Sequence, residues 1–157
     1  MSRNFKHLLL IALMLSFPVV PARARPVSTA PAQTASQDSL YKRLGGYDAL
    51  AAVSDDFLGR LASDPKEGRF FVGLGTDSRT RVRQHIVDFL CVATGGPCKY
   101  TGRDMVTAHT GLGITEEDWT IMVGQLQATF NKFKVPANLQ QEVLGALRPL
   151  KGQIAGR

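Results

Sequence analysis

The chain has 157 residues, 44% of them apolar, which is enough for one domain around a single hydrophobic core. Its formal charge of +6 would suit a nucleic-acid binder, but three basic residues and no acidic residue lie within the first 24 positions. Sixteen basic and thirteen acidic residues remain beyond them, a charge of only +3, so we exclude nucleic acid from the expected partners.

Residues 1–24 have the pattern of a secretory signal peptide. Two basic residues precede an apolar run over 8–17, which only Ser16 interrupts, and Ala22-Arg23-Ala24 offers the small-x-small site that signal peptidase accepts. This run of ten residues is too short for a bilayer span, which needs about 20. We expect an exported, periplasmic protein cleaved near Ala24, without stable membrane insertion; an uncleaved anchor is the alternative.

Residues 25–38 are rich in Pro, Ala, Ser, Thr and Gln and predict a flexible linker. The folded domain is expected over residues 39–154. It opens with a short helix over residues 40–44, which the Gly45-Gly46 pair ends.

The next segment predicts a helix with one buried face, because its apolar residues recur at three- and four-residue steps. These residues are Leu50, Val53, Phe57 and Leu61, and Asp64-Pro65 closes the helix. A loop after Phe70-Phe71 leads to a helix over 79–93, which the Thr-Gly-Gly-Pro sequence at 94–97 stops.

Glycines then flank a short turn of helix over 103–109. Thr115 and Asp118 match a capping box that opens a long helix. We expect its inward residues to be Trp119, Met122, Val123, Leu126, Phe130 and Phe133. A last helix follows Pro136 and carries Leu139, Val143 and Leu147. The helical periods predict the all-α class.

Two histidines, His85 and His109, lie beyond the expected signal peptide. His109 follows Met105 by four residues, so both occupy one face of the short helix. Such a helix suits a flat cofactor that needs one axial nitrogen ligand, although a lone His on an apolar face is more often a core residue. His85 falls about 60° from Val82, at the edge of the apolar face of its helix, where it can turn toward a ligand or toward water.

The order and spacing of many residues between about Leu40 and Lys151 resemble group I truncated haemoglobins. Each motif is weak alone, whereas the shared order is specific. The matching residues are Leu40-Tyr41, Arg43-Leu44-Gly45-Gly46, Phe57, Asp64, Phe70-Phe71, Phe89, Gly95-Gly96-Pro97, Tyr100, Gly102, Met105, His109 and Gly113-Ile114-Thr115.

The resemblance implies a two-on-two helical sandwich that binds haem b without covalent attachment, in agreement with the absence of a C-x-x-C-H motif. It makes His109 the proximal iron ligand and Phe71 the aromatic residue on the porphyrin face. The other residues that it places around the haem are Phe57, Leu58, Val82, Ile86, Phe89, Tyr100, Met105, Ile114, Trp119, Met122 and Leu126. For each apolar residue, ordinary core packing is the alternative.

Four cations are candidates to pair with the haem propionates, because two carboxylates at a pocket rim favour positive charge. They are Lys99, Arg79, Arg83 and Arg103, and each has a plain surface position as its alternative.

The distal side departs from the family pattern, which usually follows Phe57 with a Tyr that donates to a bound diatomic ligand. Here Leu58 takes that position, and Val82 and Ile86 stand at two further positions that are often polar. We therefore expect fast loss of oxygen.

His85 precedes His109 by 24 residues, as in cyanobacterial truncated haemoglobins with a distal His ligand. The resemblance therefore implies that both histidines can coordinate the iron. Contact of His85 with a propionate or with solvent is the alternative.

Two functions follow from the resemblance. The first is a globin that binds O2, NO or CO, with NO-dioxygenase-like or peroxidase-like redox chemistry. The second is a bis-histidine electron-transfer protein with weak oxygen binding and a redox partner or reductase. A helical module that has lost haem is a third alternative.

Cys91 and Cys98 can form a disulfide in an oxidising compartment, or remain buried thiols.

Overall fold

The computed structural model describes residues 38–156, so the expected signal peptide (1–24) and all of the expected linker (25–38) except Asp38 lie outside the described residues. Every regular element in this part is helical, which confirms the all-α class. The elements are α1 (Leu40–Arg43), α2 (Gly46–Ser63), η1 (Glu67–Phe71), α3 (Thr76–Ala93), α4 (Met105–His109), α5 (Glu116–Lys132), α6 (Ala137–Leu147), η2 (Arg148–Leu150) and α7 (Lys151–Ile154), where η marks a 3-10 turn.

None of the helices described between residues 38 and 156 has the length and apolarity needed to cross a membrane.

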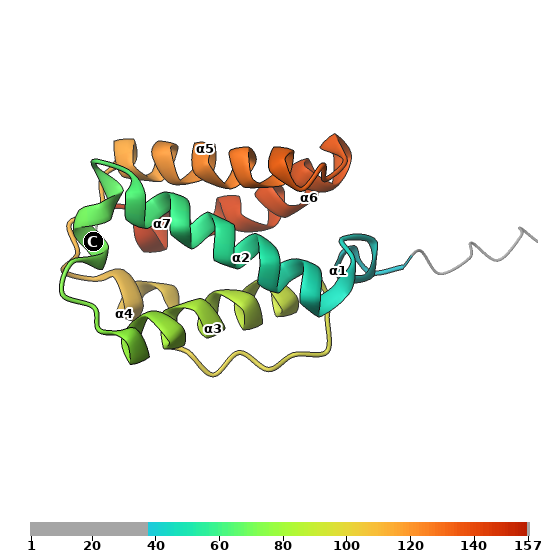
Figure 1. Ribbon diagram of the computed structural model, residues 1–157, viewed down its shortest axis with the longest axis horizontal. Helices are drawn as coiled ribbons and strands as arrows, with labels where there is room; N and C mark the ends of the chain where they lie inside the picture. Colours follow the sequence, from blue (N-terminus) through green and yellow to red (C-terminus); the bar gives the residue numbers. More distant parts are fainter. Residues whose placement is uncertain (1–37, 157) are drawn as a thin grey trace, which may run out of the picture. The chain divides into compact units, whose positions relative to one another are not determined.

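The helix α2 lies between α5 and α3 (Figure 1) and contacts both. Its predicted apolar face is buried, as the three- and four-residue spacing requires. One core cluster joins it to α5 and α6, and a second joins it to α3. The first consists of Val53, Phe57, Leu61, Leu126, Phe130 and Val143, and the second of Leu50, Leu90 and Cys91.

The start of α5 has the predicted capping box. The hydroxyl of Thr115 accepts a hydrogen bond from the backbone N–H of Asp118 at 3.2 Å, and the Asp118 carboxylate accepts from the backbone N–H of Thr115 at 2.7 Å. The expectation that Phe133 points inward is wrong, since its side chain is 41% exposed. The helix ends at Lys132, so Phe133 lies beyond the last turn and its ring stacks under the Lys132 ammonium at 5.7 Å.

The boundaries around α3 differ from the expected ones. The helix begins at Thr76 rather than near Arg79, and the residues expected to precede a loop form η1. After α3 ends, the extended segment 94–104 runs back alongside it toward α4 (Figure 1).

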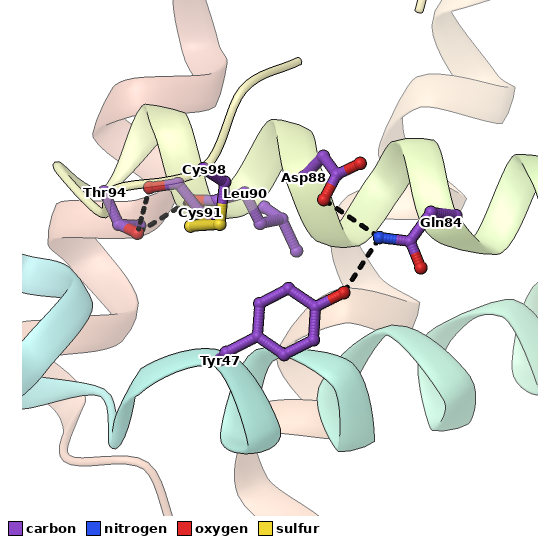
Figure 2. Close-up of a disulfide and its surroundings, with 7 residues drawn as sticks. All are labelled: Tyr47, Gln84, Asp88, Leu90, Cys91, Thr94 and Cys98. Carbon is purple, nitrogen blue, oxygen red and sulfur yellow. Dashed lines mark hydrogen bonds between the residues drawn. A yellow bond between two sulfur atoms is a disulfide. The ribbon is translucent and has the colours of Figure 1, made fainter. Parts of the chain in front are cut away.

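The returning segment is tied to α3 by a disulfide between Cys91 and Cys98 (Figure 2). Gly96 lies against the Cys91 sulfur and the ring of Tyr41, where a Cβ atom would overlap both, so this close approach requires glycine. The same view shows Gln84 of α3 donating to the Tyr47 hydroxyl of α2 at 2.8 Å. The disulfide fixes the end of α3 against the returning segment, and the bond from Gln84 to Tyr47 holds the middle of α3 to α2.

Candidate cofactor-binding site

A cavity of about 890 Å³ lies among α2, η1, α3, α4, α5 and the C-terminal segment. That volume falls in the range of cofactor pockets. Apart from the candidate cations, every residue that the sequence places around the cofactor lines it. These are Phe57, Leu58, Phe71, Val82, His85, Ile86, Phe89, Tyr100, Met105, His109, Ile114, Trp119, Met122 and Leu126. The structure thus brings the predicted residues together around one space.

The geometry of His109 fits that of a metal ligand. Its Nδ1 atom lies 2.8 Å from the backbone carbonyl oxygen of Met105. A carbonyl oxygen can only accept, so Nδ1 carries the proton and donates. The lone pair of the neutral ring is then on Nε2, and a hydrogen bond of this kind is the usual way in which a ligating imidazole is oriented.

The short helix α4 holds His109 in place. Its first turn is capped by Asp104, whose carboxylate accepts from the Thr107 backbone N–H at 2.9 Å and from the Thr107 hydroxyl at 2.6 Å. This cap compensates for the small size of the helix, which has only five residues. The predicted turn of helix is therefore present, with Met105 and His109 four residues apart on one face.

His85 projects from α3 into the cavity wall and is half-buried. Its ring meets the ring of Tyr100 edge to face, with centroids 6.0 Å apart, and Phe89 contacts the same tyrosine at 5.6 Å. The Nδ1 atom of His85 is buried and has no hydrogen-bond partner among residues 38–156. Because this nitrogen is closed off from the open cavity, the observation that bears on ligand binding is the position of the His85 ring in the cavity lining.

Tyr100 supports His85 and is not itself available as a donor to a ligand. Its hydroxyl donates to the backbone carbonyl of Arg103 at 2.7 Å. Burial, and then the charge of Asp104, raises the pKa of Tyr100, so the phenol keeps its proton at neutral pH. Gly102 lies so close to this ring that a Cβ atom would overlap it, which is why the turn requires glycine there.

Of the four cations expected near the propionates, Arg103 alone lines the cavity. Lys99 is exposed and outside the lining. Arg79 donates to the carbonyl of Leu74 at 2.9 Å. Arg83 makes a two-point contact with the Asp55 carboxylate at 2.7 and 2.9 Å.

Arg81 lines the cavity as well, and the sequence reasoning missed it. A signal was available, because Arg81 precedes His85 by four residues and therefore shares a face of α3 with it. The two arginines at the cavity, Arg81 and Arg103, are both exposed and can meet carboxylates at its rim.

Two acidic residues of the lining, Glu67 and Asp118, were also missed as site residues. They are 5% and 3% exposed, respectively. No pattern in the sequence predicts that Glu67 is buried, because the sequence does not predict the 3-10 turn η1 in which it lies. The sequence predicts Asp118 only as the cap of α5. In the structure it also pairs with Arg69 and lines the cavity.

The residues present fit a haem group. The lining is mostly apolar and aromatic, one imidazole has a free nitrogen held in a fixed orientation, and two arginines stand at the rim for the carboxylates.

Comparison with known proteins agrees with this site. The sequence model of the bacterial-like globins matches residues 39–155. A group 1 truncated haemoglobin from Mycolicibacterium paratuberculosis is 36% identical over 117 residues, which cover 74% of this chain and 84% of that one. Another, from Synechocystis, is 34% identical over 109 residues, covering 67% and 86%. The crystal structure of truncated haemoglobin from Tetrahymena pyriformis in its Fe(III) form superposes with a TM-score of 0.70 at 25% identity, over 76% of this chain and 99% of that one.

The chain therefore belongs to the bacterial-like globins and, within them, to the group 1 truncated haemoglobins. The predicted truncated-globin fold and the predicted haem cofactor, bound without a covalent link, are confirmed by this membership.

Proposed function

We propose that this globin binds haem b through Nε2 of His109 and uses it to bind diatomic gases such as O2, NO and CO. The observation that carries the proposal is the 2.8 Å hydrogen bond from Nδ1 of His109 to the Met105 carbonyl, which leaves Nε2 free and oriented. The haem supplies an iron centre for gas binding and electron exchange. The chain supplies the axial nitrogen, the aromatic contacts of Phe71 and Phe89, and the rim cations Arg81 and Arg103.

The distal side favours weak retention of oxygen. Leu58, Val82 and Ile86 line the cavity and offer no hydrogen-bond donor to a bound gas. Bound dioxygen carries partial negative charge, which donors normally hold in place. We therefore expect fast oxygen loss and easy oxidation of the iron.

Electron transfer is a second candidate function, and the presence of His85 in the cavity lining together with His109 favours it. In this proposal His85 and His109 coordinate the iron together. If both imidazoles held the iron, its protein ligands would be the same in both redox states, which would suit exchange of electrons with a partner protein or reductase. NO-dioxygenase-like or peroxidase-like chemistry stays a prediction that needs such a partner as electron donor.

The two functions are distinguished by spectra and by CO binding to the haem-loaded protein. With His85 as a ligand, the ferric form is low-spin, CO binding to the ferrous form is limited by release of His85, and His85→Ala abolishes both properties. Thr80→Ala, an exposed change on the same helix, serves as the control and should leave both unchanged. A high-spin, water-ligated ferric wild type with fast direct CO binding would favour the gas-binding function instead.

We also propose that the protein is exported and cleaved near Ala24. The disulfide between Cys91 and Cys98 supports this, since such bonds persist in oxidising compartments. The intact mass of protein recovered from a periplasmic fraction is expected to match a chain that begins near Arg25 and has lost two hydrogens. The mass of the full chain, in the cytoplasm, would contradict the proposal.

A further inference from the structure

Glu67 occupies an unusual place for a carboxyl group. It lies in η1, between α2 and α3, lines the cavity, and is 5% exposed. Its Oε1 atom is buried and has no hydrogen-bond partner among the described residues. An apolar side chain would fill such a position at lower cost, so the carboxyl group needs an explanation other than packing.

The backbone around Glu67 is fixed at its amino end by Asp64. One carboxylate oxygen of Asp64 accepts from the backbone N–H groups of Lys66 at 2.9 Å and of Glu67 at 3.2 Å. The other oxygen accepts from the side-chain amide of Gln125 in α5 at 2.9 Å. The turn is thus held to the end of α2 and to α5 together.

A second anchor lies two residues beyond Glu67. The Arg69 guanidinium donates to the Asp118 carboxylate of α5 at 2.7 Å, and the Arg69 side chain is 48% exposed while that of Asp118 is 4% exposed. With both ends of the turn anchored, the direction of the Glu67 side chain toward the cavity is fixed. Arg69 also connects this buried cluster to solvent.

The charged groups that face Glu67 are Asp118 from α5, Asp64 from the end of α2, and Arg69 from its own turn. The Arg69 guanidinium and the Thr115 N–H lower the pKa of Asp118 to about 2, so Asp118 stays ionised. Burial first, and then the negative charge of Asp118, raises the pKa of Glu67 to about 7. The proton on Glu67 is therefore exchangeable near neutral pH.

We propose that Glu67 is a proton-exchanging residue of the haem cavity, binding one proton when an electron enters the cavity and releasing it when the electron leaves. The inference rests on the proposed haem binding. The electron comes from a one-electron donor protein and reduces ferric iron to ferrous iron. One proton from solvent meanwhile binds the Glu67 carboxylate, so that the charge enclosed by the apolar lining is unchanged. An uncompensated charge in such surroundings is costly, which is why the two events are coupled.

The test is a potentiometric titration of the haem-loaded full chain from about pH 5.5 to about 8.5. In the wild type the reduction potential falls as the pH rises through this range. In Glu67→Gln, which keeps the shape and removes the titrating group, the fall is lost or strongly reduced. Glu142→Gln, at an exposed site of α6 where the carboxylate pairs with Arg43 and does not line the cavity, is the matched control and should behave as the wild type. Equal pH dependence in the wild type and Glu67→Gln would overturn the proposal, because the dependence would then come from groups other than Glu67.

A second readout is independent of the haem. Carbon NMR of labelled glutamate in the haem-free folded protein should show Glu67 titrating near neutral pH, well above the range of exposed glutamates. If Glu67 titrates at the usual acidic pH, this proposal fails even when haem binds. If the protein takes up no haem, the proposed function fails first and the coupling fails with it. Should Glu67→Gln not fold, Glu67→Leu replaces it in both experiments.

Discussion

At the scale of single residues, the buried carboxylates are the most informative groups. Asp118 has three roles in one position: it completes the capping box with Thr115, it pairs with Arg69, and it faces the cavity. Its pKa is lowered to about 2, first by the Arg69 guanidinium and then by the backbone N–H of Thr115. A carboxylate whose pKa is lower in the folded state than in the unfolded chain stabilises the fold at neutral pH.

The substitution Asp118→Asn tests this at the level of stability. At pH 7 we expect the free energy of unfolding to fall by about 1–3 kcal/mol, because the charged partner of Arg69 is lost and the cap is weakened. The contribution of Asp118 is present above its unfolded pKa of 3.8 and is lost as the pH falls toward 2, so the two proteins should converge there.

Urea unfolding at several pH values measures the difference. Asp77→Asn, in the exposed first turn of α3, is the control and should cost much less. A constant gap between Asp118→Asn and the wild type from pH 7 down to pH 2 would show that the lowered pKa is not the cause.

At the scale of elements, the segment 94–104 links the end of α3 to α4. It is held by the disulfide between Cys91 and Cys98, and by Tyr100, which packs between His85 and Phe89. The position of His85 thus depends on a segment with no regular structure of its own.

Loss of the disulfide is expected to destabilise the fold. Cys98→Ser should lower the free energy of unfolding by about 2 kcal/mol, since the closed loop is short and its entropic constraint is modest. Thermal or urea unfolding with and without a reductant supplies the measurement. A reductant should destabilise the wild type to a similar degree and leave Cys98→Ser unaffected; a reductant effect of equal size on both would contradict this origin of the stability.

The regular helices could be predicted because their signals are local. The spacing of Leu50, Val53, Phe57 and Leu61 predicted α2, and Thr115 with Asp118 predicted the start of α5. The 3-10 turn η1 could not be predicted, because it is fixed by Asp64, Gln125 and the pair of Arg69 with Asp118, which are distant or side-chain contacts. Phe133 was misplaced because a helical period says nothing about where the helix ends.

The site shows the same division between local and long-range information. The resemblance to a family placed His109 and the aromatic residues at the cavity, and the structure brings them together there. It gave no account of Glu67, whose burial arises only when η1 packs on α2 and α5. Of the two alternatives given for Arg83, a propionate contact and a plain surface position, the structure shows the second, with an ion pair to Asp55 of the facing helix. Ion pairs between residues far apart in the sequence therefore decide which charged side chains line the cavity.

At the scale of the whole molecule, the described domain has one large cavity for a cofactor, and a helix of only five residues places His109 in its wall. The helix α4 is too short to be stable alone, so the Asp104 cap and packing against the C-terminal α7 must hold His109 in position. The fold and the site are consistent with one another, because the cavity lies where α2, α3, α4 and α5 each contribute lining residues.

The central claim is that Nε2 of His109 binds the haem iron. Titration of the haem-free protein with haemin, followed by absorption spectroscopy, tests it directly when His109→Gly is compared with the wild type. We expect the wild type to bind one haem with the spectrum of a nitrogen-ligated iron, the variant to bind it much more weakly or with an altered spectrum, and added imidazole to restore the wild-type spectrum. An unchanged affinity and spectrum in His109→Gly would contradict the claim.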